Sequence, residues 1–283
     1  MGRSAQRSGT VVLSGLAFPE ALRWRAGRLV FSDIFDRSVS MLATDGSRSC
    51  LVRTDDSPSG LGWRPDGTLL IVGMRQRRLL ALGDDGIAAT VADLSAVTAG
   101  LCNDMVVDGQ GRAYVGHFGY DYTAGEQRRP STLVAIDPDG TVRTVAEGLQ
   151  FPNGMVLTPD GSTLLVAETH AHRITAFAVR AGGSLGARST FAEFPDARPD
   201  GISIDASGAV WLASPATGQV LRVDSGGAVL DRIDVDGGPT CCALGGPRLT
   251  TLFVSCGPEH DEAAALRKRA GRILAFEVDV PAA

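Results

Sequence analysis

The chain has 283 residues, a formal net charge of −5 at neutral pH, a hydrophobic fraction of 44% and 35 glycines. Glycine is therefore well above its usual share of about 7%, but the hydrophobic fraction excludes a disordered glycine-rich chain, and the negative charge argues against nucleic acid or an anionic membrane as the main partner. Glycines set among many Val, Leu, Ile and Thr residues indicate short strands joined by tight turns.

The N-terminal segment is polar and basic, and no apolar stretch of signal-peptide length follows it. We therefore expect a flexible segment over roughly residues 1–9 and a cytoplasmic protein. No stretch approaches the roughly 18 apolar residues of a transmembrane helix, so no membrane partner is expected. An odd number of cysteines without C-x-x-C spacing predicts free thiols; they are Cys50, Cys102, Cys241, Cys242 and Cys256.

A turn of one form recurs along the chain, with glycine in its last position. Five copies lie at residues 24–27, 64–67, 108–111, 158–161 and 205–208, and a degenerate sixth lies at residues 245–248. A β-type run follows each turn, and a further run comes after it in every copy. The turn glycines are 40, 44, 50 and 47 residues apart, a period typical of repeated four-stranded units.

Six copies of this length predict an all-β fold, a six-bladed β-propeller with four-stranded antiparallel blades. We expect residues 1–283 to form a single propeller domain. The last copy has no room for its fourth strand, and the run at residues 10–13 is expected to fill that place, because closing the ring removes an exposed sheet edge. Residues 261–269 place acids first and bases last, which favours a short helix.

Four polar residues occupy matching places at the start of the innermost strands. Counting back eight positions from the turn glycines leads to Asn103, Asn153 and Asp200, and counting back seven from the first turn leads to Glu20. Since equivalent strand starts converge at one mouth of a propeller channel, these side chains are expected to meet there. Two carboxylates and two amides favour Ca²⁺, or else Mg²⁺ or Mn²⁺. The alternative is that each residue caps its own local turn.

The segments that carry these residues are Phe18-Pro19-Glu20, Asn103-Asp104, Phe151-Pro152-Asn153-Gly154 and Pro199-Asp200-Gly201. They resemble the metal-site motifs of the regucalcin (senescence marker protein)/gluconolactonase/luciferin-regenerating-enzyme family. The resemblance spans essentially the whole chain. It implies a six-bladed propeller that holds one divalent cation, usually calcium, and that hydrolyses lactones, while related propellers hydrolyse organophosphates.

The same resemblance implies that Glu20, Asn153 and Asp200 are protein ligands of the cation, and that Asn103 is a further ligand or a substrate contact. Two positions depart from the sugar-lactone members. Leu101 stands where those members have an arginine, and Asp121 falls near an acidic residue that binds sugar hydroxyls there. We therefore expect a substrate ring that is less polar than gluconolactone.

Two histidines lie on connections that open on the same mouth of the channel. His117 belongs to a long connection over residues 116–130, and loops of that length often form lids or specificity elements, so a substrate contact is expected. His170 forms an H-x-H pair with His172. The H-x-H spacing can ligate Zn²⁺, but a plain surface turn, or a contact between His170 and substrate, is favoured over a zinc site.

These patterns predict a metal-dependent hydrolase, most simply a lactonase, that acts on a small-molecule substrate. The cation would polarise the ester carbonyl, Asp200 would act as general base or nucleophile, and Asn103 would orient the substrate. A phosphotriesterase, or a biosynthetic cyclase or hydratase, would use the same metal site. A non-catalytic propeller that binds calcium or another ligand is the remaining alternative. We expect a monomer or a weak homo-oligomer.

Overall fold

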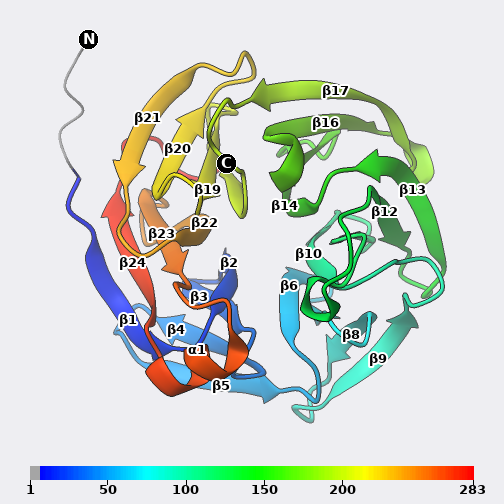
Figure 1. The fold of residues 1–283 in the computed structure, drawn as a ribbon, viewed down its shortest axis with the longest axis horizontal. Coiled ribbons are helices and arrows are strands. Elements are labelled where there is room, and N and C mark those ends of the chain that lie inside the picture. Colours follow the sequence, from blue (N-terminus) through cyan, green and yellow to red (C-terminus); the bar gives the residue numbers. More distant parts are fainter. Residues whose placement is uncertain (1–6) are drawn as a thin grey trace.

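The computed structural model describes residues 7–283. Six four-stranded sheets stand around a central channel, with all strand pairs antiparallel (Figure 1). The prediction of a six-bladed β-propeller is therefore confirmed. Among the described residues, no helix combines the length and apolar character needed to cross a membrane.

Each of the first five blades is built from four consecutive strands, ordered from the channel outwards. These strands are β2 (Pro19–Arg25), β3 (Arg28–Asp33), β4 (Ser38–Ala43) and β5 (Arg48–Arg53); β6 (Pro58–Trp63), β7 (Leu69–Gly73), β8 (Arg78–Leu82) and β9 (Ala88–Asp93); β10 (Cys102–Val107), β11 (Ala113–His117), β12 (Ser131–Ile136) and β13 (Val142–Leu149); β14 (Pro152–Leu157), β15 (Thr163–Glu168), β16 (Arg173–Val179) and β17 (Leu185–Glu193); and β18 (Ile202–Ile204), β19 (Val210–Ser214), β20 (Gln219–Val223) and β21 (Val229–Asp234).

The sixth blade joins the two ends of the described chain. It contains β22 (Pro239–Gly245), β23 (Thr251–Cys256), β24 (Gly271–Glu277) and, outermost, β1 (Thr10–Leu16). β1 pairs antiparallel with β24, so the expected ring closure is confirmed, with a strand longer than residues 10–13. The expected flexible segment falls partly on residues 1–6, which lie outside the described residues. Within its remainder, Arg7 forms an ion pair with Asp231 at 2.9 Å.

The hydrophobic core lies between adjacent blades. One cluster joins the second and third blades through Leu70 and Val72 on β7, Met105 on β10 and Val115 on β11. Successive side chains of a strand point to opposite faces, so each inner strand packs against the blades on both sides. Polar residues at the starts of the innermost strands line the mouth of the central channel.

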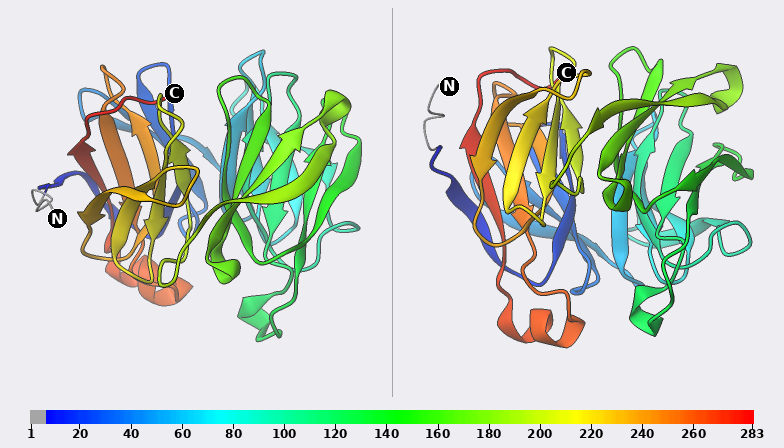
Figure 2. Two further views of the ribbon diagram at one scale, coloured as in Figure 1. Left: turned by 90° about the horizontal axis from the view of Figure 1, so that it is seen from above. Right: turned by 45° about the horizontal axis from the view of Figure 1, so that its top comes forward.

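Two insertions project from the face where the innermost strands begin. The expected helix in the sixth blade is present as α1 (Glu262–Lys268), and its N-cap Asp261 accepts a hydrogen bond from the Ala264 N–H at 2.8 Å. The other insertion carries a 3₁₀ turn at Tyr122–Ala124 in the third blade. Figure 2 shows both projecting from the same side of the ring. The remaining 3₁₀ turns are Thr169–Ala171 and Ala181–Gly183.

Asp205 holds the first turn of the fifth blade together. Its buried carboxylate accepts hydrogen bonds from the N–H groups of Ser207 (2.8 Å) and Ala209 (3.2 Å) and from Nε of Arg222 (2.7 Å). Burial opposes ionisation, but the bonds from Arg222 and Ser207 hold the pKa of Asp205 below its usual value. The stabilisation is therefore present at neutral pH and is lost as the pH falls through that lowered pKa.

We expect Asp205→Asn to lower the free energy of unfolding by about 1.5–3 kcal/mol, the usual contribution of hydrogen bonds to a charged group. Urea denaturation at pH 7 measures this loss. The matched control is Asp66→Asn, because Asp66 is an exposed residue in the corresponding turn of the second blade; a change within about 0.5 kcal/mol is expected there. Equal stability of the two variants would contradict the role of Asp205.

Candidate functional site

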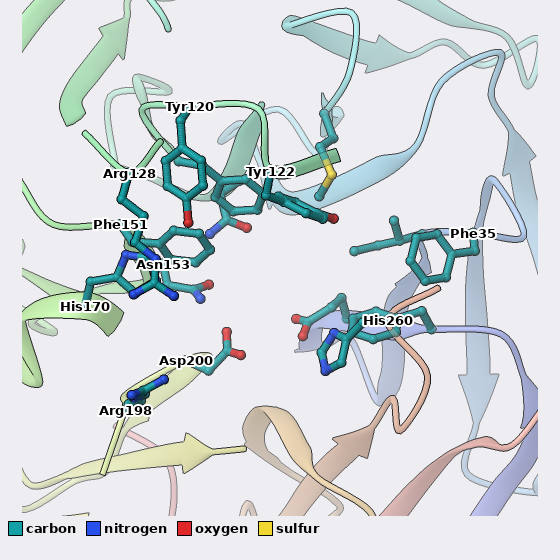
Figure 3. Close-up of a pocket in the computed structure, with 16 residues that line it drawn as sticks. Phe35, Tyr120, Tyr122, Arg128, Phe151, Asn153, His170, Arg198, Asp200 and His260 are labelled. Atoms are coloured by element: carbon teal, nitrogen blue, oxygen red, sulfur yellow. The ribbon is translucent and has the colours of Figure 1, made fainter. Parts of the chain in front are cut away.

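The four residues at the starts of the innermost strands meet around one cavity. Glu20 lies on β2, Asn103 on β10 and Asn153 on β14, and Asp200 lies two residues before β18. All four line a cavity of about 490 Å³ at the mouth of the channel (Figure 3). The spacing of the turn glycines therefore located residues that the fold brings together from four different blades.

Glycines next to these residues set the distance between neighbouring inner strands. The Gly154 N–H donates to the Asp200 carbonyl at 3.2 Å, and the Gly201 N–H donates to the Thr240 carbonyl at 2.9 Å. A Cβ atom at Gly154 would lie only 2.6 Å from the Asp200 carbonyl oxygen. The absence of a side chain thus lets the inner strands touch and fixes Asn153 close to Asp200.

Gly154→Ala should push the fourth and fifth blades apart, and we expect a loss of about 1–3 kcal/mol in stability, as is usual for overpacking. The same shift separates Asn153 from Asp200, so affinity for a divalent cation should fall as well. Thermal unfolding and calcium titration by calorimetry measure the two effects. Gly109→Ala is a suitable control, because a Cβ atom there would meet no atom within 4 Å. Wild-type stability of Gly154→Ala would contradict this packing.

The side-chain amides of the site are oriented by hydrogen bonds to the protein. Asn103 donates from Nδ2 to the Pro152 carbonyl at 3.2 Å, and Asn153 donates from Nδ2 to Oγ1 of Thr169 at 3.1 Å. The Thr169 hydroxyl in turn donates to the Pro199 carbonyl at 2.7 Å. With their nitrogens engaged in this way, the two amides can offer oxygen to a ligand. No sequence pattern had singled out Thr169.

The two carboxyl groups of the site lie in an environment that disfavours their ionisation. Burial, opposed by hydrogen bonds from Ala21 and Thr240, raises the pKa of Glu20 to about 7. Burial, followed by the charge of Glu20, raises the pKa of Asp200 well above its usual value. Among residues 7–283, neither carboxylate has an ion-pair partner within 4 Å. A bound cation would supply the missing positive charge.

Arg23, whose charge acts on Glu20, does not fill that role, because it already has a partner. Arg23 pairs with Asp104 at 2.6 Å, and both side chains are largely buried. The same guanidinium also donates to the carbonyls of Leu61 (3.1 Å) and Met105 (2.9 Å). It therefore links the inner strands of the first three blades, while Glu20 and Asp200 have no ion-pair partner within 4 Å among residues 7–283.

These donors fit a divalent cation that prefers oxygen. Two carboxylates and two oriented amides match the ligand chemistry of Ca²⁺, with Mg²⁺ and Mn²⁺ as related possibilities. No group of three or more His, Cys, Asp and Glu side chains suited to a metal occurs within residues 7–283, so such a site has to include the amides. His170 lies against Phe151, with ring centroids 4.6 Å apart, in the wall of the cavity.

Leu101, His117 and Asp121, the other three predicted substrate contacts, do not line the cavity. The buried ring of His117 has Nδ1 2.9 Å from the Ala99 carbonyl and Nε2 2.9 Å from Oγ1 of Thr132. Burial accordingly lowers its pKa. Asp121 accepts a hydrogen bond from the Thr123 N–H at 2.8 Å and caps the 3₁₀ turn. His117 and Asp121 therefore hold the loop in shape, and their contact with substrate stays a prediction.

Leu101, the third of these residues, is buried in an apolar cluster that supports the cavity wall. The wall itself is largely aromatic, and Phe118 stacks on Phe151 with ring centroids 4.3 Å apart and an interplanar angle of 4°. Phe18 and Phe151 belong to the recurring motifs, and Phe118, Tyr120 and Tyr122 lie on the connection over residues 116–130 that was expected to form a specificity element. Sequence patterns gave no role to the other wall residues, which are Ile34, Phe35, Met74, Arg128, Arg198 and His260.

Comparison with known families connects this site to a larger group of proteins. Residues 18–257 match the family model described as the SMP-30/Gluconolactonase/LRE-like region. The chain belongs to this family. The match contains Glu20, Asn103, Asn153 and Asp200, which together are called the floor of the cavity. The resemblance inferred from the short motifs is therefore confirmed.

Several relatives of this SMP-30/gluconolactonase/LRE-like chain have named activities. A pentonolactonase of Haloferax volcanii is 33% identical over 225 residues, which cover 77% of this chain and 74% of that protein. A 6-deoxy-6-sulfogluconolactonase of Pseudomonas putida is 30% identical over 63% of this chain and 62% of that protein. A gluconolactonase from Xanthomonas campestris superimposes with a TM-score of 0.78 at 25% identity, covering 96% of this chain and 89% of that chain.

A calcium-binding regucalcin from Agrobacterium tumefaciens superimposes more closely, with a TM-score of 0.83, over 100% of this chain and 98% of that chain. At 22% identity this likeness establishes the shared propeller fold alone.

Proposed function

We propose that this member of the family is a lactonase-type hydrolase that depends on a divalent cation, most simply Ca²⁺. The observation that carries the proposal is the convergence of Glu20, Asn103, Asn153 and Asp200 on one cavity, with two carboxylates that lack a cationic partner. The named lactonases among the relatives support the reaction type.

In this proposal Glu20, Asn153 and Asp200 hold the cation, and Asn103 is a further ligand or faces the substrate. When bound, a divalent cation supplies Lewis-acid polarisation of an ester carbonyl. The Asp200 carboxylate accepts a proton from the water whose oxygen attacks the carbonyl carbon. As the ring C–O bond breaks, that proton passes to the departing oxygen, so that a hydroxy acid results. The apolar wall around the floor limits the access of other water molecules.

Lactone hydrolysis by metal-free and reconstituted protein tests the proposal. Protein is stripped with a chelator and assayed on a panel of aliphatic, aromatic and sugar lactones, with Ca²⁺, Mg²⁺, Mn²⁺ or Zn²⁺ added back. We expect hydrolysis of at least one lactone class that disappears with the chelator and returns with Ca²⁺. Undiminished hydrolysis by stripped protein would overturn the metal dependence, and inactivity on every lactone would overturn the lactonase function.

A further inference from the structure

The wall of the cavity above its oxygen-bearing floor has two chemically different sides. One side is largely apolar, with Phe18, Ile34, Phe35 and Met74, and its one polar ring is His260, which lies beside Phe18 with ring centroids 5.3 Å apart. The other side carries the basic residues Arg128, His170 and Arg198 around Phe151. Figure 3 shows this second group next to Asn153 and Asp200, with Phe35 across the cavity. A ligand that fills the cavity therefore meets apolar surface at one end and positive charge at the other.

The two arginines of this basic side lack acidic partners. Among residues 7–283, no Asp or Glu oxygen lies within 4 Å of the Arg128 or Arg198 guanidinium. Other arginines on the same face are paired: Arg75 with Glu262 at 2.6 Å, and Arg129 with its loop neighbour Glu126 at 2.7 Å. Unlike these two neighbours, the arginines that face the cavity have no acidic partner.

The two guanidinium groups also act on the same neighbour. Burial, followed by the charges of Arg128 and Arg198, lowers the pKa of His170 to about 4. The imidazole is consequently neutral at physiological pH and can donate or accept a hydrogen bond beside the two cations. Positive charge is concentrated at this point of the wall, and Arg side chains bind carboxylate, sulfonate or phosphate groups through paired N–H donors.

The net charge of the cavity with a divalent cation bound also favours an anionic substrate. A divalent cation would balance the carboxylates of Glu20 and Asp200, and the lining then keeps the two positive charges of Arg128 and Arg198. Arg128 and Arg198 are exposed at the mouth of the cavity, so a neutral substrate would leave both guanidinium groups paired with water alone. An anionic substituent would pair with them and would also be attracted during its approach.

We propose that the substrate is a lactone with an apolar or aromatic body and an anionic substituent, which Arg128 and Arg198 bind while the ester carbonyl faces the floor. This rests on the proposed lactonase function. The cavity volume of about 490 Å³ lies within the usual range for small-molecule sites. Phe18, Ile34 and Phe35 offer no side-chain hydrogen bond to sugar hydroxyls, and His260 alone could not satisfy the several hydroxyls of a sugar ring, so such a ring would be poorly accommodated on that side.

A matched pair of lactones tests both parts of the proposal. The probes are γ-phenyl-γ-butyrolactone and its para-carboxy derivative, with D-glucono-δ-lactone as a polar reference. We expect kcat/KM for the carboxy derivative to exceed that for the phenyl lactone by about tenfold at low salt, since a charge-assisted hydrogen bond contributes at least that much. Both aromatic probes should be hydrolysed faster than gluconolactone. Sodium chloride should reduce the anion preference by screening it.

Variants assign the preference to particular residues. Arg128→Ala and Arg198→Ala should each reduce the ratio of kcat/KM between the two aromatic lactones by severalfold, and the double variant should bring it close to one. Arg129→Ala is the matched control, because this arginine adjoins Arg128 in the loop but pairs with Glu126. It should keep the wild-type ratio.

Equal kcat/KM for the two aromatic lactones, or an anion preference that survives in the double variant, would overturn the anion site. Faster hydrolysis of gluconolactone than of either aromatic probe would overturn the apolar part. Inactivity on every lactone would instead remove the proposed function. In that case calorimetric binding of the two aromatic probes still tests the basic wall, and equal affinities in the wild-type protein would contradict it.

Discussion

Asp200→Asn is expected to lower kcat for lactone hydrolysis by about 10³-fold, within the range for loss of a general acid–base group, without unfolding the protein. The amide has nearly the same shape but cannot accept the proton of the attacking water, and it removes one negative ligand from the cation site. Steady-state kinetics on the best lactone measures the loss.

Stability distinguishes this chemical role from damage to the fold. Because burial and the charge of Glu20 raise the pKa of Asp200, ionised Asp200 destabilises the metal-free protein at neutral pH. The neutral Asp200→Asn should therefore unfold at the same temperature as metal-free wild type or at a higher one. Asp196→Asn, an exposed residue of the same connection, serves as the control and should retain full activity. Undiminished hydrolysis by Asp200→Asn would refute its catalytic role.

Glu20→Gln is expected to weaken calcium binding by about 10²-fold or more, since the number of charged ligands strongly determines affinity for this ion. The neutral side chain keeps the size of Glu20 but loses the charge that its burial makes costly. Hydrolysis should be lost at micromolar calcium and partly restored at millimolar calcium. Calcium titration by calorimetry and the calcium dependence of kcat measure the two effects.

Glu193→Gln, at the exposed end of β17, is the matched control for Glu20→Gln and should bind calcium like wild type. Rescue by excess calcium separates weakened binding from a misfolded site. Calcium affinity equal to that of wild type would show that Glu20 is not a ligand, and it would leave the two amides and Asp200 as too weak a set for the proposed site.

The repeating part of the molecule could be predicted from sequence, because strand length and turn chemistry constrain every blade in the same way. Glycines such as Gly111 and Gly161 both adopt positive φ in the turns, so their positions give a fixed reference along each innermost strand. Counting from them located Asn103 and Asn153 at the cavity. Ring closure followed from the missing strand of the last blade.

The walls of the cavity could not be predicted in that way, since each connection folds through contacts of its own. His117 looked like a rim residue, yet it is buried and its ring lies within hydrogen-bonding distance of Ala99 and Thr132. No sequence pattern assigned a role to Arg128 or Arg198, because the role proposed for them depends on the spatial proximity of two loops 70 residues apart in the sequence. Likewise, the contact between Gly154 and Asp200 depends on how neighbouring blades approach one another.

A crystal structure of the protein grown with calcium, with anomalous diffraction used to locate the ion, tests the central claim most directly. The account predicts one calcium ion at the mouth of the channel, about 2.3–2.6 Å from oxygens of Glu20, Asn153 and Asp200. No ion at that position, at a calcium concentration that supports hydrolysis, would contradict the account. So would an active protein whose only bound metal lies at His170 and His172.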